Sequence, residues 1–281
     1  MIEHLLQHHQ PGVFLITIVV AAIGSLLSLG FASRARGAQG ASRWQWLALA
    51  SLTLGGVAVW SMHFIAMMGY SPGDLTVRYD PLLTIVSGLL AVAVMAVALT
   101  LTLNQDSPLR LLAGGAIAGI GVVSMHYMGM FSMNFRGTMS HETGYVATAI
   151  GIALVAATVA LWFATRLRNA VSLVGASLIM ALAVNAMHYV GMAGVRITPD
   201  AEWDGVALQG SGVTELMIPL ILGLFAIVLA CSTALMFTEN GRDDAPSSHN
   251  GPTDAPETGS DRRAAPTSRN TPGDDVWGRR G

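Results

Sequence analysis

Seven long apolar runs constrain the fold of this 281-residue chain more than any other feature of its sequence. Each run is close to the roughly 20 residues that a helix needs to cross the hydrocarbon core of a bilayer. A helix also satisfies its backbone hydrogen bonds within one segment, which a lipid environment requires. Because 52% of the residues are apolar and only 11% are charged, we expect an all-α, polytopic integral membrane protein in a lipid bilayer. The runs cover residues 12–31, 45–67, 81–103, 109–131, 145–165, 170–192 and 215–237.

The rest of the composition excludes several functional classes. The net charge is −2 and every basic residue is an arginine, so no strong positive field points to nucleic acid. Cys231 is the only cysteine, which leaves neither a disulfide framework nor a thiolate cage for a metal. The sequence has no glycine-rich phosphate loop, no paired catalytic carboxylates and no nucleophile beside a base. We therefore expect a protein that is not an enzyme.

The arginines in the short loops predict the orientation of the spans. Cytoplasmic loops carry an excess of basic residues. The loops after spans one, three and five hold Arg34, Arg36, Arg43, Arg110, Arg166 and Arg168, whereas those after spans two, four and six hold Arg78, Arg136 and Arg196. The first set is predicted to be cytoplasmic, which places the amino terminus outside and the carboxyl terminus inside.

The composition changes after about Thr238. Residues 239–281 are rich in Gly, Pro, Ser, Thr, Asp and Arg and almost free of apolar residues. Such a segment cannot bury enough apolar surface to order itself. We expect two parts: a seven-span membrane domain over residues 1–238 and a disordered cytoplasmic tail over residues 239–281.

A short motif recurs at the ends of the even-numbered runs. It reads Met-His-(Phe/Tyr)-x-(Gly/Ala)-Met and occupies residues 62–67, 125–130 and 187–192. Its histidines are 63 and 62 residues apart, so we expect three repeated helix pairs plus a seventh helix. The three spans run in the same direction, and their histidines should reach a common depth near the outer face. These histidines are His63, His126 and His188.

Within each copy, the second methionine follows the histidine by four residues. At about 100° per residue, both side chains lie on nearly the same helix face, one turn apart. The pairs are His63 with Met67, His126 with Met130, and His188 with Met192. The methionine before each histidine points about 100° away, so it either flanks the site or packs against a neighbouring helix. These methionines are Met62, Met125 and Met187.

Histidine and methionine together make a copper ion the first candidate cofactor. Imidazole binds several transition metals, whereas a thioether is a soft donor that favours copper, particularly Cu(I). Haem with axial His or His/Met ligation is the second candidate. Two interpretations without a metal stay open: packing of a methionine-rich bundle, and a structural cluster of histidines that bond one another or water. Three copies at one depth favour a shared site over packing.

The strings MHFIAM, MHYMGM and MHYVGM, on alternate spans of a seven-span chain, resemble the MHYT family of bacterial integral membrane sensor domains over about residues 10–238. The resemblance implies an inner-membrane location, copper bound by the motif's Met and His side chains, and sensing of a diatomic gas such as O2, CO or NO. The residues to which this applies are Met62, His63, Met67, Met125, His126, Met130, Met187, His188 and Met192. Two features depart from the family pattern: Phe64 replaces the motif tyrosine, and no output domain follows the seventh span.

Two classes of function therefore remain. The first is a membrane sensor module, in which an outer-face copper site responds to a gas or to redox state and signals to a separate partner protein. The alternative is a membrane copper carrier or redox component that serves an oxidase-type enzyme.

Overall fold

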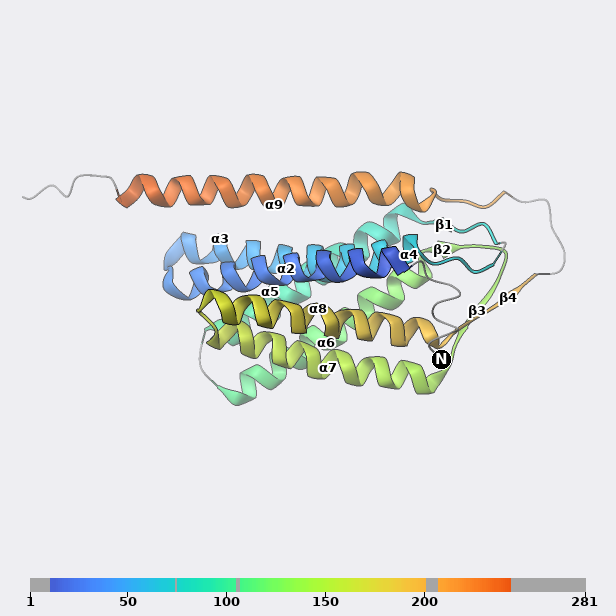
Figure 1. The fold of residues 1–281 in the computed structure, drawn as a ribbon, viewed down its shortest axis with the longest axis horizontal. Helices are drawn as coiled ribbons and strands as arrows, with labels where there is room; N and C mark the ends of the chain where they lie inside the picture. The colour runs from blue at the N-terminus through green and yellow to red at the C-terminus, as the bar shows by residue number, and fades with distance from the viewer. Residues whose placement is uncertain (1–10, 74, 105–106, 201–206, 244–281) are drawn as a thin grey trace, which may run out of the picture. The chain divides into compact units, whose positions relative to one another are not determined.

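Helices make up most of the part of the chain that a computed structural model describes, which is residues 11–73, 75–104, 107–200 and 207–243. Seven helical spans within these residues are long and apolar enough to cross a membrane, which confirms the predicted all-α, seven-span fold. The helices are α2 (Pro11–Gly37), a second span formed by α3 (Gly40–Ser51), η1 (Leu52–Ser61) and α4 (Met62–Met68), then α5 (Pro81–Leu103), α6 (Pro108–Phe131), α7 (Thr143–Arg166), α8 (Ala170–Ala193) and α9 (Val213–Asp243) (Figure 1).

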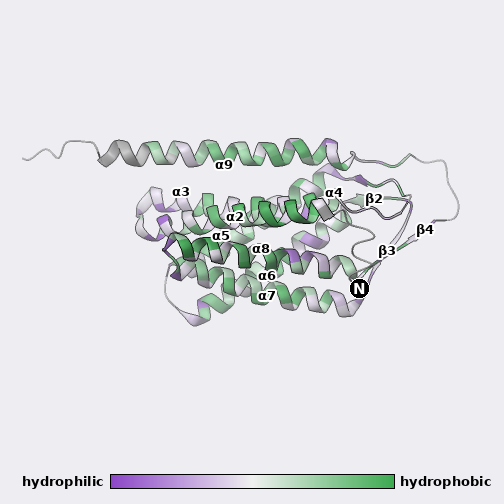
Figure 2. Cartoon of the chain, in the orientation of Figure 1, coloured by the Kyte–Doolittle hydropathy of each residue, from purple (hydrophilic) through white to green (hydrophobic). Residues whose placement is uncertain are grey.

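Local sequence signals fix where several helices begin. Pro81 and Pro108 lie in the first turns of α5 and α6, where a missing backbone N–H removes no helical hydrogen bond. Asp80 caps α5, because its Oδ1 accepts a hydrogen bond of 3.0 Å from the backbone N–H of Leu83. Proline and polar residues at these points separate one apolar run from the next. Figure 2 shows that hydrophobic residues continue along the helices.

The second span is the central helix of the bundle. In its most apolar stretch 83% of the residues are buried, against 39% or less in each other span. Glycines allow its neighbours to approach closely. A Cβ at Gly24 of α2 would come within 2.5 Å of the backbone nitrogen of Ala58, and a Cβ at Gly55 within 2.7 Å of the carbonyl oxygen of Ala91 in α5. Hydropathy alone did not reveal this central position, because all seven spans are strongly apolar.

The middle of this span, η1, is a π-helix of 10 residues. Runs of this kind are rare and occur mostly as single turns near functional sites. The hydroxyl of Ser61 donates to the carbonyl oxygen of Gly56, five residues earlier, at 3.0 Å. Trp60 anchors the segment to α5, since its Nε1–H lies 3.1 Å from both the carbonyl oxygen of Thr84 and Oγ of Ser87. The π-helix ends at the residue before Met62, so its wider turn sets the direction in which the motif side chains leave the helix.

Two small antiparallel sheets connect the loops at the end of the helices where the motifs lie (Figure 1). In the first, β1 (Arg78–Tyr79) pairs with β2 (Met133–Asn134). In the second, β3 (Gly137–His141) pairs with β4 (Val195–Pro199) over five residue pairs. The sheets tie together the loops that follow the three motif helices, so they hold the ends of these helices in a fixed relationship.

At the opposite helix ends, arginines of the short loops bind backbone carbonyls. Arg36 donates to the carbonyl oxygens of Ala164 and Leu167 at the end of α7. Arg43 donates to the carbonyl oxygen of Leu103 at 3.1 Å and to Oδ1 of Asn104 at 2.7 Å at the end of α5. These arginines therefore cap helix ends in addition to any effect on insertion. The orientation with the amino terminus outside stays a prediction.

The last helix reaches past the expected boundary of the membrane domain. α9 continues to Asp243, so the first residues of the expected tail over 239–281 are helical. Residues 244–281 lie outside the described part of the chain. By their contacts, residues 1–239 form one unit and residues 240–281 another. Within the first unit, α9 meets the central span at Gly56, where a Cβ would lie 3.1 Å from a methyl group of Leu224.

Candidate metal centre

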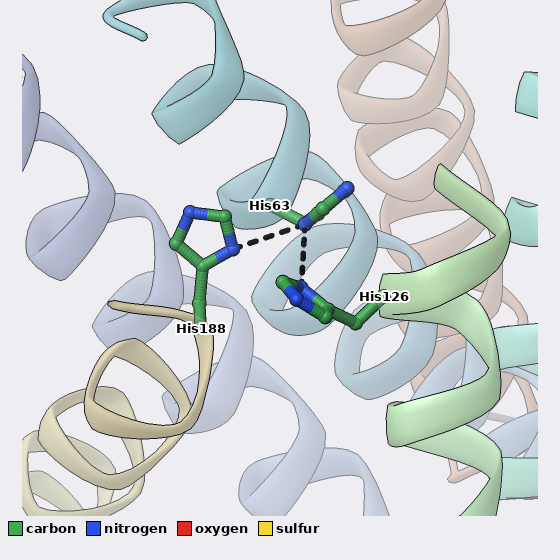
Figure 3. A group of neighbouring side chains, drawn as sticks. All are labelled: His63, His126 and His188. Carbon is green, nitrogen blue, oxygen red and sulfur yellow. Dashed lines mark hydrogen bonds between the residues drawn. The ribbon is translucent and has the colours of Figure 1, made fainter. Parts of the chain in front are cut away.

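Three histidine rings meet in the interior, one from each motif helix (Figure 3). His63 comes from α4, His126 from α6 and His188 from α8. Nδ1 of His63 lies 3.0 Å from Nδ1 of His188 and 3.2 Å from Nδ1 of His126. The possible ligand atoms of the three rings all lie within 4.8 Å of one another. The sequence spacing thus identified a single cluster drawn from three separate helices.

The cluster has near three-fold geometry. The ring centroids are 5.0, 5.0 and 5.2 Å apart, and the ring planes meet at 77°, 79° and 84°. This arrangement follows from the repeat, because three copies of one helix present the same residue at the same depth to a common axis. All three side chains are at most 1% exposed. Polar side chains buried this deeply inside membrane spans are costly and typically serve a function.

The small residue of the motif supports the ring of another copy. A Cβ at Gly129 would come within 2.4 Å of Nε2 of His63. In the same way, a Cβ at Gly191 would come within 2.8 Å of Nε2 of His126. The first copy thus packs on the second, and the second on the third. The (Gly/Ala) position of the motif is therefore part of the cluster, a role that its place in the sequence does not reveal.

The hydrogen-bonding capacity of imidazole limits how this cluster can be satisfied. A neutral ring offers one N–H and one lone pair. Nδ1 of His63 is close to Nδ1 of both neighbours. In a neutral ring this nitrogen carries either one proton or one lone pair, so it can make only one full hydrogen bond. Neutral rings alone therefore leave one of these two contacts without a full hydrogen bond. One cation among the three Nδ1 atoms would use all three lone pairs at once.

The distances fit such a cation. Nitrogen ligands about 2.0 Å from a metal lie about 3.3–3.5 Å apart in tetrahedral or trigonal coordination. The distances from His63 to its two neighbours, 3.0 and 3.2 Å, are close to this range. Among the described residues, the Nε2 atoms of His63 and His126 are buried and have no hydrogen-bond partner. They face Gly129 and Gly191, so packing rather than hydrogen bonding holds the Nε2 side of these two rings.

The motif methionines are all buried. Those four residues after the histidines are at most 4% exposed, and they are Met67, Met130 and Met192. Of those before the histidines, Met62 packs with Ala21 and Ala181, and Met187 lines an interior cavity. Met125, the third of this set, is fully buried in the main core. The part that each methionine takes in metal binding stays a prediction.

The aromatic residue after each histidine packs edge-on against that histidine. The centroid distances are 4.8 Å for His63 with Phe64, 4.9 Å for His126 with Tyr127 and 5.0 Å for His188 with Tyr189. All three contacts use the ring edge or face and none needs a hydroxyl. Phe64 can therefore take the place of tyrosine in the first copy without loss of this contact.

A fourth histidine lies close to this site. His141 of β3 packs against Tyr127, with ring centroids 5.2 Å apart. Burial lowers the pKa of His141 from its ordinary value, so the neutral form is favoured. No sequence pattern marks this residue, since only its place in the β3–β4 sheet brings it near a motif.

These features define a polytopic membrane protein in which an internal repeat gathers three buried histidines into one cluster. The family described as "Bacterial signalling protein N terminal repeat" matches residues 56–115, 119–177 and 181–247. The chain belongs to this family, the MHYT family, and is a multi-pass protein of the bacterial inner membrane. Each matched repeat begins shortly before a motif, so α2 is the additional helix in this division.

Several longer signalling proteins resemble the chain. A bifunctional diguanylate cyclase/cyclic di-GMP phosphodiesterase, MucR of Pseudomonas aeruginosa, is 35% identical over 225 residues, which are 77% of this chain and 32% of MucR. An uncharacterized signaling protein of Caulobacter vibrioides is 33% identical over 69% of this chain and 24% of its own length. The cyclic di-GMP phosphodiesterase NbdA of P. aeruginosa is 28% identical over 84% of this chain and 30% of its own length. The chain thus spans about a third or less of these relatives, and no solved structure matches it.

Proposed function

We propose that this protein is a membrane sensor module whose histidine cluster holds a copper ion and responds to a diatomic gas or to redox state. The observation that carries the proposal is the meeting of three buried histidines, from three helices, each with a ring nitrogen within 4.8 Å of the other two. The chain's membership of a family of signalling-protein repeats supports a sensory role.

The donor set favours copper. Among the described residues, the cluster contains three imidazoles and no carboxylate or thiolate. Buried thioethers lie one helical turn from each imidazole, at Met67, Met130 and Met192. Neutral nitrogen and soft sulfur donors suit Cu(I) better than zinc or magnesium. Haem is disfavoured, because a porphyrin between two of these rings would need a far wider gap than their spacing provides.

Bound copper would supply an open coordination position for O2, CO or NO, or a change of oxidation state. The residues of the chain would convert such an event into a helix movement. His63 is fixed to α4, which continues η1 without a break, so a shift of its ring acts on the central helix of the bundle. A segment can change from π-helical to α-helical hydrogen bonding, so the shift would spread through η1.

Burial favours a sensor over a carrier. A carrier must load and release its ion, and exposed donors make this easier. Here each histidine is at most 1% exposed. We propose that the ion is resident and that the signal passes to a separate signalling protein. The relatives that make or hydrolyse cyclic di-GMP indicate the kind of pathway involved, as their names state for those proteins.

The test uses the full-length protein purified in a mild detergent. Metal analysis should find copper, and the optical or X-ray absorption spectrum should change when air is replaced by carbon monoxide. The His63→Ala protein should lose both the copper and the response. A wild-type protein that binds no copper in either oxidation state would contradict the proposal, and so would copper that shows no response to O2, CO, NO or reductant.

A further inference from the structure

An apolar cavity lies among the helices of the bundle, and one of the motif methionines forms part of its wall. It has a volume of about 50 Å³ and is lined by residues of α2, η1, α5, α6, α7 and α8. Three methionines contribute to its wall: Met95 of α5, and Met180 and Met187 of α8. Met187 is the neighbour of His188 in the chain. The cavity and the cluster are therefore linked through one motif copy, because Met187 lines the cavity and His188 belongs to the cluster.

The lining excludes water and favours an apolar occupant. Ser25 is the only polar side chain among the lining residues. A water in a cavity needs two to four polar partners, so cavities of this composition stay dry and accept apolar molecules. A dry cavity of about 150 Å³ holds benzene or xenon. At about 50 Å³ this cavity is too small for benzene but has room for a diatomic molecule or a single noble-gas atom.

The wall that α7 and α8 contribute is where a molecule dissolved in the lipid would have to enter. Here the lining consists of small side chains that are partly exposed, at Ala156, Ala160 and Ala183. No large side chain has to swing aside at these positions. Small apolar gases dissolve in hydrocarbon, so the bilayer itself can supply them. The outer face of the protein is not needed for entry.

We propose that this cavity is a binding site for a small apolar molecule of diatomic size, which enters from the bilayer and is held against Met187, the motif residue before His188. The biological role of this site rests on the proposed gas-sensing function. Its physical content, the binding of an apolar atom at this place, does not depend on the metal.

The test is xenon binding to the full-length protein, followed by NMR of methionine methyl groups. Xenon binds to apolar cavities and does not coordinate copper. The methyl resonances of Met95, Met180 and Met187 should shift with xenon pressure and reach saturation. Met217, which is buried but does not line the cavity, reports general effects of burial. Met236, which is 41% exposed, reports xenon dissolved in the detergent.

Variants of α7 provide matched controls. Ala153→Val adds methyl groups inside the cavity and should abolish the saturable shifts. Ala147→Val makes the same change at an exposed position of the same helix and should preserve them. Ala118→Val of α6 fills the cavity from another side and serves if the first variant fails to fold.

The proposal would be overturned by the absence of a saturable shift in the wild-type protein, or by shifts at Met217 and Met236 as large as those of Met95, Met180 and Met187. Shifts that survive both filling variants would also overturn it. Xenon binding together with a copper site that ignores carbon monoxide would support the cavity while contradicting the gas-sensing function.

Discussion

Gly129 lies against the imidazole of His63 so closely that a Cβ at this position would come within 2.4 Å of Nε2. The glycine belongs to the second motif copy and the histidine to the first. This contact and that of Gly191 with His126 make the copies interdependent, because the rings of His63 and His126 each need a small residue on another helix. The small residue of the motif therefore does more than allow two helices to pack closely, because it contacts one particular histidine ring.

The first prediction concerns this contact. Gly129→Ala should displace the ring of His63 and lower bound metal severalfold. Alanine normally stabilises a helix relative to glycine, so a loss cannot come from helix propensity. Overpacking of this kind costs about 1–3 kcal/mol of the free energy of unfolding. Metal analysis measures the loss of bound metal, and thermal unfolding measures the loss of stability.

Gly151→Ala is the matched control. Gly151 lies in α7 with open space around its missing Cβ, so its substitution should leave metal content unchanged. Equal metal content in the Gly129→Ala and Gly151→Ala proteins would contradict the role assigned to Gly129.

The second prediction is that the three histidines form one site. Replacing His63, His126 or His188 singly by alanine should remove most of the bound metal, because one imidazole and one thioether are too few donors to hold the ion. The fold should survive, since packing of apolar helix faces provides most of the stability. His141→Ala is the control and should retain its metal, because His141 contacts Tyr127 rather than the cluster.

Metal-to-protein ratios decide between the models. A drop of about one third in each variant would indicate three independent sites. Unchanged ratios would restore the interpretation of the cluster as packing.

The sequence predicted the spans and the meeting of the histidines for simple physical reasons. Apolar length fixes which segments cross a membrane, and equal spacing on parallel spans brings His63, His126 and His188 to one depth. Neither inference needs knowledge of how the helices pack. Both were confirmed by the seven spans and by the cluster of ligand atoms.

Features that depend on packing could not be predicted in this way. The central place of the second span depends on close approaches such as that of Gly24 to Ala58. The π-helix of η1 is a change of hydrogen-bond register that apolar residues do not encode. The β1–β2 sheet has two residues in each strand, too few for an alternating pattern. His141 reaches Tyr127 only through the β3–β4 pairing.

The third prediction separates methionines that bind from those that pack. Met67→Leu, Met130→Leu and Met192→Leu remove a thioether while nearly keeping side-chain volume, so each should weaken Cu(I) binding with a stability loss under about 1.5 kcal/mol. Met62→Leu should leave copper binding unchanged, because Met62 packs with Ala21 and Ala181. Competition with a Cu(I) chelator measures both affinities. A loss for Met62→Leu as large as that for Met67→Leu would assign ligation to the first motif position as well.

The last prediction concerns orientation in the membrane. The histidine cluster should lie near the outer face and the carboxyl terminus in the cytoplasm, because the loops after spans one, three and five hold more arginines than the others. Two of these arginines, Arg36 and Arg43, also bind carbonyls at helix ends. The excess of arginine in these loops therefore has a role in packing as well as in orientation. Reporter fusions separate the two influences. A fusion after Ser71 should report the outside, and one after Asp243 the cytoplasm.

The caps offer a control for the same experiment. Arg36→Lys keeps the charge and disturbs the planar donor geometry that reaches both Ala164 and Leu167. It should lower thermal stability and leave both reporter signals unchanged. Cytoplasmic signal after Ser71, or external signal after Asp243, would reverse the orientation and place the histidine cluster near the inner face. In that case the histidine cluster would still be intact, but an ion bound there would exchange with the cytoplasmic side of the bilayer.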